Sequence, residues 1–129
     1  MNHSLKSYFA AFLAIALTTL SIHAQAATAS YYADKFNGRK TANGERFSNQ
    51  GMTCASNQFK LGSYVKVINA KNGKSIICKV NDRIGKSGRI DLTKKAFSHL
   101  APLSQGIVKV HIKPTHKKPR QTTHKHQPR

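Results

Sequence analysis

The chain has 129 residues, enough for one small domain, and it carries 22 lysines and arginines against four aspartates and glutamates, a formal net charge of +18. A field of this size attracts polyanions in general, and it does not choose among teichoic acid, peptidoglycan carboxylates, lipid headgroups and nucleic acid. The sequence lacks a CxxC motif and a Cys/His cluster with zinc spacing, so it indicates neither a metal site nor a cofactor.

Residues 1–26 have the pattern of a secretory signal peptide. A short start with Lys6 and no acid precedes a nearly continuous apolar run over residues 9–22, and small residues at 24 and 26 mark the cleavage site. The apolar run is shorter than the roughly 20 residues that span a bilayer, which leaves a retained membrane anchor as the alternative. No cysteine lies near the cut to accept a lipid. We expect an exported protein, periplasmic or secreted, without a membrane anchor.

Four segments after the signal peptide have the alternation or the residue types of strands. They are residues 29–36, 63–70, 71–82 and 106–114, the last ended by Pro114. Asn72-Gly73 between the second and third segments predicts a tight β-hairpin, because this pair readily adopts the backbone of a hairpin turn.

One stretch, residues 91–103, has apolar residues at helical spacing. Asp91 is expected to cap its start by accepting a free backbone N–H, and Pro102 is expected to end it. Many short strands with one short helix predict a mainly β protein, a small barrel over residues 27–113.

Residues 114–129 are rich in lysine, arginine, histidine and proline and contain no acid. A segment with so little to bury is expected to form a basic disordered tail. It would bind anionic polymers of the cell envelope or, alternatively, serve only for solubility. Export argues against a nucleic-acid partner, and we expect a monomer.

Cys54 and Cys78 are the only cysteines of the chain. In an exported protein an even pair favours a disulfide, and two buried free thiols are the alternative. Closing this loop would stabilise the fold by roughly 3 kcal/mol.

The four acidic residues are Asp34, Glu45, Asp82 and Asp91. With Asp91 expected at a helix cap and Asp34 in a polar turn, Glu45 and Asp82 remain for chemistry. Two carboxylates that face a cleft can cut a glycosidic bond, one by giving a proton to the leaving oxygen and the other by stabilising positive charge. Each also precedes an arginine, and composition alone favours two ion pairs instead. Spacing does not decide between these interpretations.

The segments "ASYYADKFNGRKTANGERF" and "LGSYVKVINAKNGKSIICKVNDRIGKSGRIDLTKKAF" resemble the RlpA (rare lipoprotein A) family, in order, over residues 29–97. The shared motifs include A-S-x-Y, T-A-N-G-E-x-F and N-D-R. The resemblance implies a six-stranded double-psi β-barrel, akin to the barrel of plant expansins. It also implies a periplasmic, endolytic lytic transglycosylase that cuts peptidoglycan strands, preferably without stem peptides, and leaves 1,6-anhydro-N-acetylmuramic acid ends.

The resemblance places the family's catalytic glutamate on Glu45 and its catalytic aspartate on Asp82. The family's histidine has no counterpart, because Ser56 stands at its position. Asp82 can still act as acid and then as base, with Glu45 as an electrostatic partner or substrate positioner. The residues expected to bind substrate are Asn43, Arg46, Ser56 and Arg83.

Three functions are therefore compared. The first is a lytic transglycosylase, weakened by loss of the histidine. The second is a non-catalytic or expansin-like peptidoglycan-binding barrel, which Ser56 would permit. The third is a cationic effector that acts on anionic surfaces through charge alone, for which the barrel groove would be dispensable.

Overall fold

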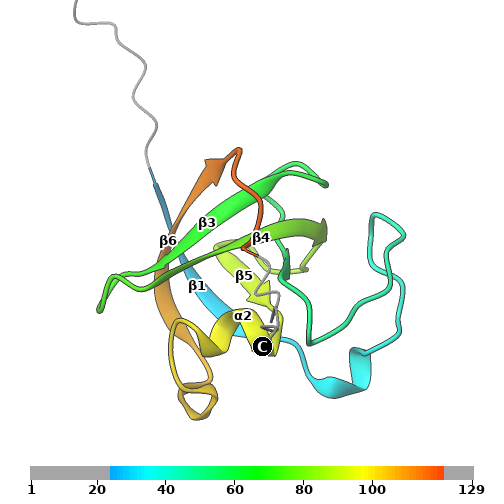
Figure 1. Cartoon of the computed structure of the whole chain (residues 1–129), viewed down its shortest axis with the longest axis horizontal. Coiled ribbons are helices and arrows are strands. Elements are labelled where there is room, and N and C mark those ends of the chain that lie inside the picture. Colours follow the sequence, from blue (N-terminus) through cyan, green and yellow to red (C-terminus); the bar gives the residue numbers. More distant parts are fainter. Residues whose placement is uncertain (1–23, 121–129) are drawn as a thin grey trace, which may run out of the picture.

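The computed structural model describes residues 24–120, which form a closed barrel of strands in the order β1-β5-β2-β4-β3-β6 (Figure 1). The strands are β1 (Gln25–Tyr31), β2 (Thr53–Ala55), β3 (Tyr64–Asn69), β4 (Ser75–Asp82), β5 (Arg89–Leu92) and β6 (Val108–Thr115). Helix α2 (Lys94–Ser98) and two 3-10 turns, η1 (Asp34–Phe36) and η2 (Leu103–Gln105), lie in the connections. The predicted mainly β barrel with a short helix is confirmed.

The predicted signal peptide lies outside the described residues except for its last three positions. Gln25 and Ala26 already belong to β1, where they pair with Ile112 and His111 of β6. The end of the predicted tail, residues 121–129, also lies outside the described part. Between residues 24 and 120, no helix combines the length and the apolar character needed to cross a membrane.

Two strand pairs of the barrel are parallel, β1 with β5 and β2 with β4, and the others are antiparallel. Closure gives each strand two hydrogen-bonded neighbours, so the short strands present no free edge to a second molecule. The parallel pairing also brings residues far apart in the sequence to the same end of the barrel.

The predicted hairpin at Asn72-Gly73 is confirmed, because β3 and β4 pair antiparallel on either side of it. Gly73 has a φ of 77°, a left-handed conformation that a side chain would strain. The first predicted strand is shifted: β1 begins at Gln25 and ends at Tyr31, and residues 34–36 form η1 instead. The chain leaves the barrel after Tyr31, where its pairing with β5 ends at Leu92.

The predicted helix is shorter than residues 91–103, and the prediction that Asp91 caps it is wrong. Asp91 lies in β5, paired with Ser30 of β1 and Ala55 of β2. Pairing on both sides keeps this residue in the sheet, so α2 begins later. Its N-cap is Thr93, whose hydroxyl accepts the Ala96 amide at 3.1 Å.

Strand β6 does not end at Pro114, as predicted, but continues to Thr115, with Pro114 opposite Val65 of β3. The pairing of β6 with β1 ends at Ile112. A proline beyond that point lies at the end of the ladder, where a missing N–H costs little. The barrel therefore extends two residues into the segment predicted as a tail.

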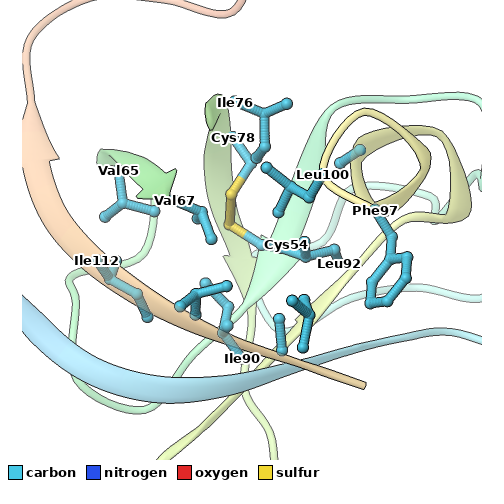
Figure 2. Close-up of a cluster of buried hydrophobic side chains, with 14 of the residues drawn as sticks. Cys54, Val65, Val67, Ile76, Cys78, Ile90, Leu92, Phe97, Leu100 and Ile112 are labelled. Atoms are coloured by element: carbon cyan, nitrogen blue, oxygen red, sulfur yellow. A yellow bond between two sulfur atoms is a disulfide. The ribbon is translucent and has the colours of Figure 1, made fainter. Parts of the chain in front are cut away.

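The barrel interior is filled by alternate residues of the strands, together with Phe97 and Leu100 from the region of α2 (Figure 2). The predicted disulfide between Cys54 and Cys78 is confirmed, with a Cα–Cα distance of 5.9 Å. Both cysteines are fully buried, and their bond joins the neighbouring strands β2 and β4. It therefore joins the two strands that lead to Ser56 and Asp82.

Candidate active site

The turn at residues 41–45 is held by its own polar groups. The Thr41 amide donates to the Glu45 carbonyl at 2.8 Å, and Gly44 adopts a φ of 92° that favours glycine. The Asn43 side-chain oxygen accepts from the Thr41 hydroxyl at 2.8 Å and from the Glu45 amide at 3.1 Å. The backbone amide of Asn43 in turn donates to the backbone carbonyl of Asn81 in β4. Asn43 was predicted to bind substrate. Its side-chain oxygen instead holds the turn in shape.

Glu45 forms an ion pair with Lys79 of β4, not with the adjacent Arg46. Its Oε2 lies 2.6 Å from the Lys79 Nζ, and its Oε1 accepts from the Asn81 side-chain amide at 3.1 Å. Arg46 instead donates to the Gly38 carbonyl at 3.0 Å. The hydrogen bond from Lys79 lowers the pKa of Glu45 below its ordinary value. Glu45 is therefore ionised near neutral pH and can supply negative charge but not a proton.

Asp82 lies at the end of β4, directly after a β-bulge. Cys54 and Ala55 of β2 pair with Val80 and Asp82, which leaves Asn81 as the extra residue. Bulges re-aim side chains and are common beside active sites. This irregularity places the Asp82 carboxylate at the rim of the barrel.

Hydrogen bonds fix both carboxylate oxygens of Asp82. Its Oδ1 accepts the backbone amides of Ala42 and Arg83 at 2.9 and 3.0 Å. Its Oδ2 accepts the hydroxyl of Tyr32 at 2.6 Å. Arg83 does not form an ion pair with Asp82, because its guanidinium donates to the carbonyls of Ser56 and Phe59, each at 2.6 Å. Both ion pairs with neighbouring arginines that the composition favoured are therefore absent.

A pocket of about 460 Å³ opens in front of Asp82. Its wall includes an aromatic cluster in which Tyr32 stacks on Phe47 with a centroid distance of 4.1 Å and meets Phe36 edge to face at 5.9 Å. Cations and a second carboxylate complete it; the lining residues are Tyr32, Phe36, Arg39, Lys40, Thr41, Phe47, Asp82, Arg83, Ile84, Gly85 and Asp91. Glu45 does not line this pocket, so the two predicted catalytic acids do not share it.

Tyr32 is a residue of this site that sequence reasoning missed. Burial and the hydrogen bond to Asp82 raise the pKa of Tyr32 above its ordinary value. The hydroxyl therefore keeps its proton and can donate to Asp82 throughout the neutral range. Its place in the A-S-x-Y motif was the one available signal, because Tyr32 lies 50 residues from Asp82 in the sequence.

Asp91 is the second missed residue, because it was assigned to a helix cap. Its Oδ1 accepts the hydroxyl of Ser30, which also accepts from Arg89 at 2.9 Å. Asp91 and Asp82 are the carboxylates of the pocket, and both interact electrostatically with Tyr32 to raise the pKa of its hydroxyl.

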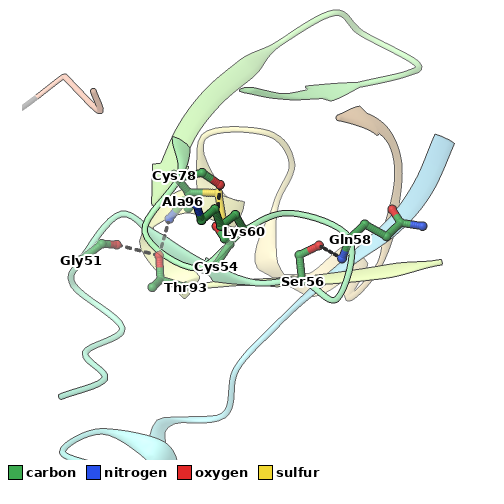
Figure 3. Close-up of a disulfide and its surroundings, with 9 residues drawn as sticks. Gly51, Cys54, Ser56, Gln58, Lys60, Cys78, Thr93 and Ala96 are labelled. Carbon is green, nitrogen blue, oxygen red and sulfur yellow. Dashed lines mark hydrogen bonds between the residues drawn. A yellow bond between two sulfur atoms is a disulfide. The ribbon is translucent and has the colours of Figure 1, made fainter. Parts of the chain in front are cut away.

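Ser56 is buried, with 1% of its surface exposed, and its hydroxyl accepts the Gln58 amide at 3.1 Å (Figure 3). Its own amide donates to the Asp82 carbonyl at 3.0 Å. This burial argues against the predicted contact between Ser56 and substrate, since the side chain has almost no surface to offer a glycan. Ser56 and Arg83 instead fasten the loop after β2 beside Asp82. A histidine at position 56 would have to displace its neighbours.

The Glu45–Lys79 ion pair predicts a small pH dependence of stability. Because the folded-state pKa of Glu45 is lowered, the contribution is present above its ordinary value of 4.5 and lost as the pH falls through the lowered value. We expect Glu45→Gln to reduce the free energy of unfolding by less than about 1 kcal/mol near neutral pH, since the pair is partly exposed. Urea denaturation near neutral pH and in acid checks this. An equal loss at both pH values would contradict it.

Known proteins resemble this chain in sequence. The family model described as lytic transglycolase matches residues 24–112. The endolytic peptidoglycan transglycosylase RlpA of Neisseria meningitidis (strain Z2491) is 43% identical over 90 residues, which cover 68% of this chain and 38% of that protein. RlpA of Pseudomonas aeruginosa (strain UCBPP-PA14) is 44% identical over 87 residues, covering 66% and 26%. The chain thus spans well under half the length of these relatives.

Solved structures share the barrel. The expansin of Clavibacter michiganensis, in a mutant form solved with cellohexaose, superposes with a TM-score of 0.58 at 18% identity. The superposition covers 72% of this chain and 50% of the expansin chain. The Streptomyces papain inhibitor superposes with a TM-score of 0.56 at 25% identity, covering 73% and 98%. The expected double-psi barrel and the resemblance to the RlpA family are confirmed.

Proposed function

Because the chain belongs to the lytic transglycolase family, we propose that it cuts the glycan strands of peptidoglycan and leaves 1,6-anhydro-N-acetylmuramic acid ends. The observation that carries the proposal is the Asp82 carboxylate, fixed at the rim of an open pocket beside the Tyr32 hydroxyl. The names of the RlpA relatives support the same substrate and the endolytic mode. A preference for strands without stem peptides is part of the proposal.

In this reaction Asp82 first gives a proton to the glycosidic oxygen, so that the bond to the leaving sugar breaks without a free alkoxide. The C6 hydroxyl oxygen of N-acetylmuramic acid then bonds to the anomeric carbon, and its proton passes to Asp82. The 1,6-anhydro ring closes, no water is consumed, and the carboxyl group regains the proton that it gave. One residue thus serves as acid and then as base.

The hydrogen bonds around Asp82 suit this cycle. Two backbone amides occupy Oδ1, which leaves Oδ2 as the oxygen that exchanges the proton. Tyr32 donates to Oδ2 and stabilises the carboxylate that remains after the proton has left. Glu45 contributes negative charge and the shape of the 41–45 turn, whose Ala42 amide holds Asp82.

The pocket walls suit a glycan with charged substituents. The rings of Phe36 and Tyr32 are partly exposed and can stack on the apolar faces of sugars. Arg39 and Lys40 line the same pocket and can bind the lactyl carboxylates that strands without stem peptides expose.

Mass spectrometry of purified glycan strands after digestion tests the proposal. New 1,6-anhydro ends are expected from naked strands, and fewer from strands that keep their stem peptides. Strand binding without any anhydro ends would overturn it and leave the non-catalytic, expansin-like barrel as the better description.

Replacement of Tyr32 by phenylalanine is expected to slow the cutting of naked strands by about tenfold to a hundredfold, because it removes one hydrogen bond to a charged group. The ring and its stacking on Phe47 are kept, so the fold should be unaffected. Tyr31→Phe is the matched control, since the Tyr31 hydroxyl donates to the Leu103 carbonyl and not to the pocket. Anhydro-end formation over time is the measurement, and equal rates for both variants would refute this role for Tyr32.

The place of action and further partners also belong to the proposal. The apolar run at residues 9–22 supports export, with action in the periplasm or outside the cell. We further propose that the protein acts as a monomer and without a membrane anchor. The basic residues after β6 support attraction to anionic polymers of the envelope.

A further inference from the structure

A second hollow, of about 980 Å³, lies on a different part of the barrel from the Asp82 pocket and shares no lining residue with it. Its lining comes mainly from β3, β4 and β6, from the region of α2 and from the segment after β6. Figure 1 shows that segment turning back from the end of β6 past β4. We call this hollow the basic groove. Its cations are Lys66, Lys74, Lys95, Lys113, Lys117, Lys118 and Arg120, and no acid lines it.

The chain has no carboxylate side chain left to neutralise the basic groove. Its four acids are all engaged elsewhere: Asp34 with Lys94 at 2.8 Å, Glu45 with Lys79, and Asp82 and Asp91 at the pocket. The remaining nine residues, 121–129, add Lys125 and Arg129 and no acid. The groove cations are therefore not neutralised by any carboxylate side chain of the chain and are free to bind an external anion.

The sheet itself places like charges against each other in this groove. Lys66 of β3 lies directly opposite Lys113 of β6 in the antiparallel register. Residues directly opposite each other in an antiparallel pair have Cβ atoms only about 5 Å apart. Like charges at such positions repel each other and destabilise the strand pair. Two lysine side chains that start from such close positions can bring their ammonium groups to different oxygens of one phosphate group, which would turn the repulsion into a binding site.

The basic groove is a hollow, which favours a ligand that can enter it over a flat surface. Its apolar lining comes from Met52, Ile76, Ile77 and Pro114, with the cations around it. A membrane surface would meet the exposed cations but not the floor of a hollow, whereas a flexible polymer can follow it. We propose that the basic groove binds a linear, phosphate-bearing polyanion of the cell envelope. That the polyanion belongs to the cell envelope rests on the proposed function, whereas the binding of a phosphate-bearing polyanion by the groove does not.

Fluorescence anisotropy of the full chain with labelled inorganic polyphosphate tests this proposal. We expect Lys66→Gln combined with Lys113→Gln to weaken binding by about tenfold at low salt and to make the dependence of log K on log salt shallower by roughly 1.4. The matched control is Lys71→Gln combined with Lys109→Gln, which removes the same charge outside the groove. The control should change the affinity by less than about twofold.

Equal losses for the two pairs would overturn the proposal, because they would indicate diffuse attraction to net charge. Tighter binding to phosphatidylglycerol vesicles than to polyphosphate, with the same dependence on Lys66 and Lys113, would overturn it in favour of a membrane. Should the first pair fail to fold, Lys74→Gln with Lys117→Gln replaces it, with the same expected loss.

The proposal can fail separately from the proposed function. Asp82→Asn should bind polyphosphate like the wild type, and the groove variants should still form anhydro ends on naked strands. If the groove variants bind polyphosphate normally while wild type cuts glycan, only the basic groove is refuted.

Discussion

Replacement of Asp82 by asparagine is expected to reduce the cutting of naked glycan strands by about 10² to 10⁴-fold, the usual contribution of a positioned acid–base group. The amide has nearly the same volume, and its oxygen can still accept the Ala42 and Arg83 amides that fix Oδ1. It carries no exchangeable acid proton at neutral pH, so neither half of the proposed cycle can run. Anhydro ends counted by mass spectrometry over time measure the loss.

Asp34→Asn is the matched control for this experiment. It also removes one of the four acids, but at an exposed ion pair with Lys94 outside the pocket. We expect it to cut strands at the wild-type rate. If Asp82→Asn stays folded and cuts as fast as this control, Asp82 is not the acid.

Loss of the disulfide is expected to cost the protein about 3 kcal/mol of unfolding free energy, a factor of about 150 in the folding equilibrium. The bond closes a sequence separation of 24 residues between Cys54 and Cys78, and both side chains are fully buried. Replacing both cysteines by alanine also leaves a small void in the core, which adds to the loss. Urea denaturation of the double variant against the wild type measures the difference.

The reduced wild-type protein provides the control, because it loses the crosslink but keeps both sulfur atoms. It should fall between the oxidised wild type and the double alanine variant. A denaturation midpoint that does not move on reduction would show that the crosslink contributes nothing to stability. The bond joins β2 and β4 beside the Asp82 bulge, so we also expect slower glycan cutting in the reduced protein.

The features that could be predicted from the sequence depend on short stretches of it. Asn72-Gly73 marks the turn of one hairpin, and the alternation in residues 63–70 specifies which side of a strand is buried. The pairing of Cys54 with Cys78 followed from export and from the lack of any other cysteine. The candidate acids followed from their rarity and from motif positions that match a family. The placement of Asp82 at a pocket was the part of that expectation that the structure supports.

The errors arose where pairing between distant segments outweighed a local preference. Asp91 precedes a helical pattern, yet β1 and β2 hold it in a strand, so it lines the pocket instead of capping α2. Glu45 stands next to Arg46 in the sequence, but the 41–45 turn presents it to Lys79. Ser56 follows a strand whose parallel pairing with β4 buries it.

What only the tertiary structure decided is which groups touch each other. Tyr32 and Asp82 are 50 residues apart in the sequence and are brought together by the barrel. Tyr32 follows β1 and Asp82 ends β4, and the paired strands β5 and β2 connect β1 to β4. Lys66 faces Lys113 because β3 and β6 close that barrel on its other side. Local sequence sets the backbone preference and the exposed face of each strand. Register between strands is set by the packing of all of them together, and it is register that places a hydroxyl on a carboxylate or one lysine against another.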